Sequence, residues 1–218
     1  MRRTTLIHWR AVWLAALLAA GGGAACAAGL ALRDRVVADV AGEPVTLRQV
    51  VIMASLEAGR KVDPSERELV AGALEHEITQ VIIMRDIARN PSYEEENPDQ
   101  AGMRQALEQK CGGPDGLRRL QEELRLSDAA LDRFIHRQAL TAAFVRLHFN
   151  PFVYVSEEEV RKYYAEVFVP RLGVGAVPPD FESVQEKLTE ILQQRKINAE
   201  FDSWLERQKK ELKVKLIE

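Results

Sequence analysis

The sequence holds only two cysteines among its 218 residues. Cys26 lies among small residues near the N-terminus, and we expect it to leave with an export signal or to carry a lipid. Cys111 would then have no partner, so an internal disulfide is excluded. No evident activating residue accompanies Cys111 in the sequence, which favours a structural role over a catalytic one.

Motifs that mark catalytic or cofactor sites are also absent. The chain has no HExxH, GxSxG, P-loop or paired CxxC sequence and no Rossmann glycine pattern. His76, His136 and His148 fall far apart in the sequence, which favours structural or surface roles over metal binding. We therefore predict a protein that is not an enzyme, with no catalytic residue, no metal site and no cofactor.

Basic residues are fewer than acidic ones, 30 against 33. The first 28 residues contain three arginines and no acidic residue, so their removal changes the formal charge from −3 to −6. A mildly acidic surface argues against nucleic acid as a partner, because phosphate backbones are also negative. Residues 90–98, with three successive glutamates and two prolines, are predicted to form an exposed acidic loop.

Residues 1–28 are typical of an export signal. Arg2, Arg3 and Arg10 precede an apolar run, and small residues surround Cys26. This pattern predicts a periplasmic or otherwise extracytoplasmic protein. Two alternatives stay open. Residues 23–26 form a weak lipidation sequence that would anchor the chain through Cys26, and residues 11–32, uncharged for 22 positions, could span a bilayer if uncut.

A small sheet is predicted from the two ends of the mature chain. Residues 36–40 are mostly β-branched, residues 41–44 favour a turn, and an apolar segment resumes at Val45, which indicates a β-hairpin. Residues 212–217 form the only other convincing alternating run in the sequence. Because two strands alone are marginally stable in water, we expect this third strand to join the hairpin.

The rest of the chain is predicted to be helical. Capping boxes at residues 46–49 and 156–159 mark two helix starts, and Asp63 followed by Pro64 marks a third. The last helix carries an apolar stripe whose phase slips at residues 193–196. We expect helices over residues 47–58, 64–89, 99–110, 115–125, 127–149, 156–168 and 180–212. The fold class is therefore mainly α, with a small β-sheet.

Three ordered segments carry a resemblance to a known family. Residues 34–46 read DRVVADVAGEPVT, residues 74–88 form an apolar helix, and residues 126–135 read LSDAALDRFI. They resemble the N-terminal part of the SurA-type periplasmic chaperones and foldases. The resemblance implies a helical chaperone domain over residues 29–151, completed by helices and a strand over residues 152–218.

The parvulin prolyl-isomerase domain of that family has no counterpart here. Where it would be inserted, this chain has only the eleven residues 169–179, which are predicted to form a loop. Eleven residues reach at most ~40 Å when extended and cannot form a sheet with an enclosed active site. None of the family's isomerase residues can therefore be carried over to this chain.

The resemblance implies an ATP-independent envelope chaperone that holds unfolded exported or outer-membrane proteins in an apolar helical groove. Flexible methionine and aliphatic side chains tolerate many client sequences. The candidate client-binding residues are Met53, Leu56, Ile83, Met84, Ile87, Phe144 and Phe149. An alternative is that they only complete the core. Two other functions stay open: residual prolyl isomerase activity, and a lipid-anchored assembly factor with one dedicated partner.

Overall fold

The predicted β-hairpin is present at the start of the described chain. The computed structural model describes residues 34–91, 98–173 and 176–217. Strands β1 (Val36–Val40) and β2 (Glu43–Thr46) pair antiparallel across a two-residue turn. Ala41 and Gly42 at this turn have φ angles of 53° and 88°, the left-handed conformation that a type I′ hairpin requires. The Gly42 amide donates to Asp39 Oδ1 at 3.1 Å, which further fixes the turn.

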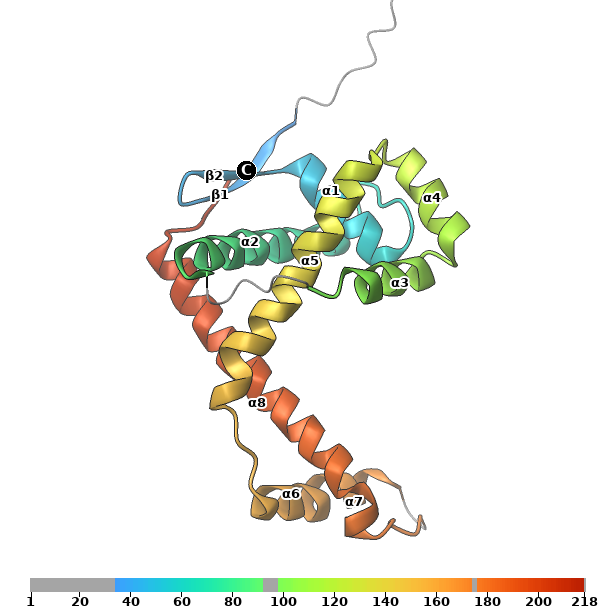
Figure 1. Cartoon of the computed structure of the whole chain (residues 1–218), viewed down its shortest axis with the longest axis vertical. Helices are drawn as coiled ribbons and strands as arrows, with labels where there is room; N and C mark the ends of the chain where they lie inside the picture. The colour runs from blue at the N-terminus through green and yellow to red at the C-terminus, as the bar shows by residue number, and fades with distance from the viewer. Residues whose placement is uncertain (1–33, 92–97, 174–175, 218) are drawn as a thin grey trace, which may run out of the picture. The chain divides into compact units, whose positions relative to one another are not determined.

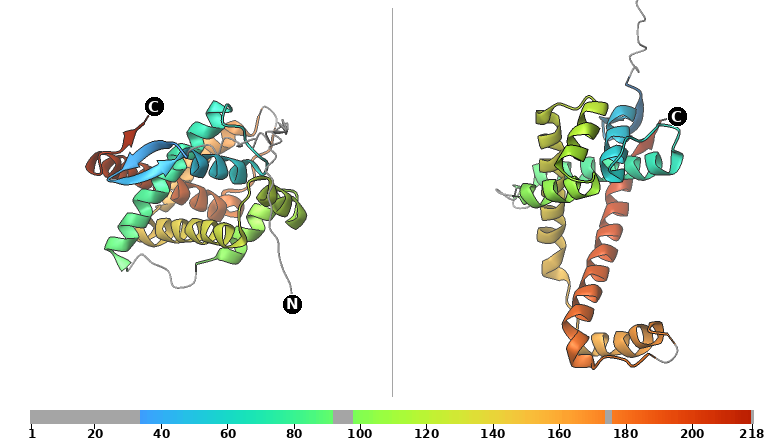
Figure 2. Two further views of the ribbon diagram at one scale, coloured as in Figure 1. Left: turned by 90° about the horizontal axis from the view of Figure 1, so that it is seen from above. Right: turned by 90° about the vertical axis from the view of Figure 1, so that its right-hand side faces the viewer.

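The C-terminal end of the chain adds the third strand, as predicted. Strand β3 (Lys215–Leu216) pairs antiparallel with β1, which gives the order β2-β1-β3 (Figures 1 and 2). The Ile217 amide donates to the Val37 carbonyl at 2.9 Å. β3 is shorter than the six-residue run predicted for it, because the Val214 amide still donates to the Lys209 carbonyl and closes the preceding helix.

Helices make up most of the described chain, which confirms a mainly α fold with a small sheet. Thr46 and Gln49 form the predicted capping box at the first helix, and Ser156 and Glu159 form a second one. In chain order the elements are α1 (Leu47–Ala58), α2 (Arg67–Arg89), α3 (Gln100–Lys110), α4 (Pro114–Glu123), α5 (Asp128–Phe149), η2 (Asn150–Phe152), α6 (Glu157–Tyr163), η3 (Tyr164–Phe168), α7 (Val169–Arg171) and α8 (Phe181–Glu211).

Helix α2 begins at Arg67, so the predicted start at Pro64 was wrong. The Asp63 carboxylate accepts from the Ser65 amide at 2.9 Å, which is the pattern of an Asx turn and not of a helix cap. The Glu66 carboxylate in turn accepts from the Asp63 amide at 2.9 Å. A polar turn held by these two bonds therefore replaces the first helical turn.

This turn is expected to make the protein sensitive to acid. The Arg60 guanidinium, 2.6 Å from the Glu66 carboxylate, and the Asp63 amide lower the pKa of Glu66 from 4.5 to about 2. A carboxylate with a lowered pKa stabilises the folded state above pH 4.5 and loses that contribution as the pH falls toward 2. We expect the urea midpoint of the native protein to fall more steeply over this range than that of Glu66→Gln. Equal slopes would contradict this assignment.

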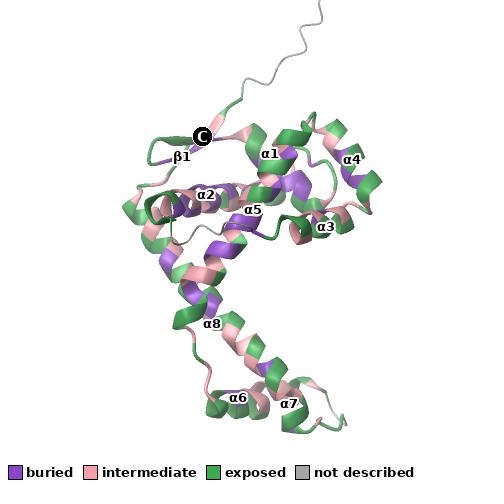
Figure 3. Ribbon diagram, in the orientation of Figure 1, coloured by how far each residue is buried: buried purple, intermediate pink, exposed green. Residues whose placement is uncertain are grey.

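One apolar core joins the sheet, α1, α2, α5 and the C-terminal half of α8. Figure 3 shows its buried positions as purple segments on these helices. Aromatic rings link α5 to α8: Phe144 lies 5.3 Å from Trp204 and Phe149 lies 5.7 Å from Phe201, between ring centroids. The chain on both sides of residue 151 therefore contributes to the same core.

Helix α8 packs in two different cores along its length. Its first half contributes Phe181 and Leu188 to a small core with Val160 of α6, and its second half contributes Ile197 and Trp204 to the main core. The predicted phase slip at residues 193–196 lies between these halves. Figures 1 and 2 show α8 running from α6 and α7 to the sheet.

The segment predicted as a loop over residues 169–179 is partly helical, which corrects that prediction. The π-helix η3 continues α6, and α7 continues it as far as Arg171. The Tyr164 hydroxyl then donates to the Pro179 carbonyl at 2.6 Å, just before α8 begins. Residues 174–175 lie outside the described ranges.

The predicted export signal, Cys26 and most of the acidic loop also lie outside the described residues. Within residues 34–91, 98–173 and 176–217, no helix combines the length and apolar character that a bilayer span needs.

Candidate functional site

Six of the seven predicted client-binding residues are buried. All six belong to the cores described above, and none is more than 5% exposed: Met53, Leu56, Ile83, Ile87, Phe144 and Phe149. They complete the core in this conformation, which was the alternative that the sequence left open. Only Met84 among the seven is half-buried, and its side chain reaches a surface cavity.

Two surface cavities with largely apolar linings meet at Phe134, a half-buried residue of α5. Phe134 lines two cavities, one toward α3 and one toward the start of α1. We call them the His76 cavity and the Arg133 cavity. A single aromatic ring thus forms part of the wall of both.

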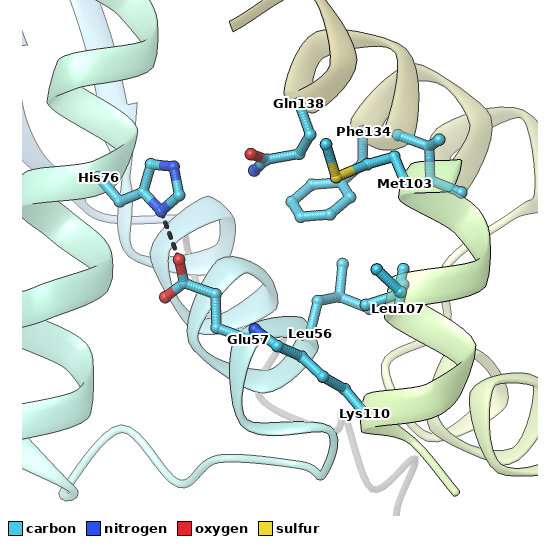
Figure 4. A pocket seen from close by; sticks show the side chains of 10 residues that line it. Leu56, Glu57, His76, Met103, Leu107, Lys110, Phe134 and Gln138 are labelled. Atoms are coloured by element: carbon cyan, nitrogen blue, oxygen red, sulfur yellow. Dashed lines mark hydrogen bonds and ion pairs between the residues drawn. The ribbon is translucent and has the colours of Figure 1, made fainter. Parts of the chain in front are cut away.

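The His76 cavity lies between α1, α2, α3 and α5 and measures about 130 Å³ (Figure 4). Gly59, which ends α1 with a φ of 66°, brings α1 against α3, since a Cβ there would lie 2.2 Å from the Lys110 carbonyl oxygen. The residues that line the cavity are Leu56, Glu57, His76, Met103, Ala106, Leu107, Lys110, Phe134, Ile135 and Gln138.

Polar groups stand on one side of the His76 cavity. His76 Nδ1 contacts the Glu57 carboxylate, and the Gln138 amide lies 3.5 Å from the sulfur of Met53. A histidine–carboxylate pair can act as a general base, but serine, threonine and cysteine are absent from the lining residues. The cavity therefore suits binding of an apolar group better than covalent catalysis.

The Arg133 cavity is larger, about 490 Å³, and lies between α1, α2, α5 and the turn before α5. Most of its lining is apolar, and arginines stand beside this surface. The lining residues are Gln49, Ile52, Glu77, Met84, Leu126, Ala130, Arg133, Phe134, His136, Arg137 and Leu140. Its volume is in the range of sites that bind small molecules or single side chains of a peptide.

A buried ion pair forms part of the wall of the Arg133 cavity. The Glu77 side chain is 3% exposed and its Oε1 accepts from Arg137 at 2.8 Å, while the Arg137 side chain is 29% exposed. Burial raises the pKa of Glu77 above its usual value, although Arg137 acts in the opposite direction. The positive charge of Arg137 therefore offsets the cost of burying an ionised Glu77 carboxylate.

The remaining candidate groups do not assemble a reactive centre in the described part of the chain. Burial raises the pKa of the half-buried Cys111 thiol, which disfavours the reactive thiolate. His76 and His136 line different cavities, and His148 lies in the aromatic cluster near Trp204. Among the described residues no three potential metal ligands come together.

Phe134, Ile52 and Met103 were not among the site residues predicted from the sequence. The sequence places Phe134 on the apolar face of its helix, as it does Phe144 ten residues later. Periodicity identifies the apolar face of a helix, but it does not tell which part of that face the other helices leave uncovered.

Comparison with known proteins adds no relative. No family model matches this chain, no curated protein matches it, and no solved structure matches it.

Proposed function

We propose that this protein is an ATP-independent holdase chaperone of the cell envelope, which binds unfolded exported or outer-membrane proteins. The supporting observation is the pair of apolar cavities on either side of Phe134. An extended chain that passes over Phe134 could place one apolar side chain in each cavity. Binding of this kind shields apolar segments from aggregation and needs no nucleotide.

The side chains around the cavities fit a binder with low sequence specificity. Met103 lines one cavity and Met84 lines the other, and both are half-buried. Methionine adapts its shape to different apolar partners because its side chain is unbranched and polarisable. The envelope location rests on the export-signal pattern of residues 1–28 and on the resemblance to the SurA-type chaperones.

Prolyl isomerase activity gains no support from the described part of the chain. Between η3 and α8 it contains α7 and a short connection to Pro179. A dedicated assembly factor would use the same apolar surface, but it would form one stoichiometric complex where a holdase binds many clients weakly.

Suppression of aggregation tests the proposal. An unfolded outer-membrane protein is diluted from urea into buffer, with or without a several-fold molar excess of the full chain, and light scattering is followed. We expect the protein to reduce scattering without ATP. We expect the double variant Met84→Glu/Met103→Glu to lose most of this effect, because a charge in each cavity disfavours apolar contact.

Leu69→Glu is the matched control, because Leu69 is 40% exposed on α2 and lines neither cavity. Circular dichroism must show that all variants remain helical. The proposal fails if the unmodified protein leaves scattering unchanged, or if Leu69→Glu and the double variant lose suppression equally.

A further inference from the structure

The Arg133 cavity has a charge opposite in sign to that of the whole chain. Its lining holds two arginines and one carboxylate, and that carboxylate, Glu77, is already paired with Arg137. The whole chain, by contrast, carries a net charge of −3. A local positive potential on an acidic protein attracts anionic groups to that place in particular.

Both arginines have hydrogen-bond donors that are not engaged within the described part of the chain. Arg133 is exposed and forms no ion pair within the described ranges. Arg137 donates from one of its amino groups to the Glu77 carboxylate. The Nε atom of Arg137 is buried and has no hydrogen-bond partner in the described structure. The Arg137 side chain is nevertheless 29% exposed beside the cavity, so an anionic group can approach its guanidinium from the solvent side.

The apolar part of the cavity lies beside these donors. Ile52, Met84 and Phe134 each line it, and each is half-buried. A ligand that fits both parts must carry an apolar group and an anionic group, such as a carboxylate, close together. In an extended peptide, neighbouring side chains point to opposite faces, and residues two apart share a face.

From this arrangement we infer that the Arg133 cavity binds an extended polypeptide segment in which an apolar side chain is followed, two residues later, by an aspartate or glutamate. The apolar side chain packs on Phe134 and Met84 while the carboxylate accepts from Arg133 and Arg137. The inference rests on the proposed function and adds a charge preference to it. Clients would be held first at apolar segments with acidic flanks.

Fluorescence anisotropy with labelled ten-residue peptides tests this preference. Three peptides share a central Leu-Phe pair and differ only in flanking residues, which are aspartate, serine or lysine. We expect the aspartate peptide to bind the full chain about tenfold more tightly than the lysine peptide at low salt, and the difference to shrink at high salt. The net charge of the protein alone would give the opposite order.

Arg133→Glu should remove or reverse the preference, because it places a carboxylate at the edge of the cavity. Arg207→Glu is the matched control: Arg207 is exposed on α8, forms no ion pair within the described residues and makes the same change in net charge. We expect this variant to keep the preference of the unmodified protein.

The outcomes separate this inference from the proposed function. Equal binding of the three peptides, or equal loss of preference in the Arg133 and Arg207 variants, overturns the inference while the holdase function stands on the scattering assay. If no peptide binds but aggregation is still suppressed, the inference is again overturned and the holdase function stands. If neither peptides nor unfolded clients are bound, both proposals fail.

Discussion

Phe144→Ala is expected to destabilise the protein by about 3–5 kcal/mol, the usual cost of removing a buried aromatic ring. Phe144 is 0% exposed, and its ring lies 5.3 Å from that of Trp204 and 6.2 Å from that of Phe149. Truncation leaves a cavity at the place where α5 meets the C-terminal half of α8. The unfolding free energy from urea titration, monitored by tryptophan fluorescence and circular dichroism, measures the loss.

Phe152→Ala is the matched control for this prediction. The Phe152 side chain is 83% exposed, just beyond the end of α5, so its removal should change stability by about 0.5 kcal/mol or less. A loss below 1 kcal/mol for Phe144→Ala would contradict the burial of this ring. If Phe144 bound clients directly, its removal would instead weaken aggregation suppression and leave the unfolding free energy intact.

The parts of the fold that could be predicted are those fixed by neighbouring residues. Thr46 and Gln49 cap α1 because their side chains lie three residues apart, whatever the rest of the chain does. The tail strand was also predicted, because an alternating run at one end and an incomplete sheet at the other leave few pairings. Local chemistry and the need to pair strands thus determine most of the secondary structure here.

The wrong predictions come from interactions elsewhere in the chain that compete with a local sequence pattern and cannot be seen in it. Asp63 and Pro64 can start a helix, but Asp63 also accepts from the Ser65 amide in a turn. The ion pair between Arg60 and Glu66 stabilises that turn, and Arg60 does not belong to the helix-start pattern. The burial of six of the seven candidate residues was missed for a similar reason. Phe134 and Phe144 lie on the same helix, but Phe144 is buried against other elements, among them Trp204 of α8, whereas Phe134 is only half-buried.

The second large effect is expected from Arg137→Met. This variant leaves the Glu77 carboxylate buried without its cation, which costs about 3 kcal/mol at neutral pH, near the lower end for a broken buried pair because Arg137 is partly exposed. The double variant Glu77→Gln/Arg137→Met removes the buried charge as well, so it should recover most of the lost stability. Urea titration of the native protein and both variants measures the difference.

The pH dependence shows whether charge is the cause. The pKa of Glu77 is raised in the folded state, so folding binds a proton and the contribution of Glu77 to stability falls as the pH rises above 4.5. Loss of Arg137 raises this pKa further, because Arg137 is the group that lowers it. The defect of Arg137→Met should therefore be large at pH 7.5 and small at pH 4, where Glu77 is protonated in both folded and unfolded states. A defect of equal size at both pH values would instead assign the effect to the packing of the arginine side chain. This part of the lining of the Arg133 cavity would then be stabilised by packing and not by the ion pair.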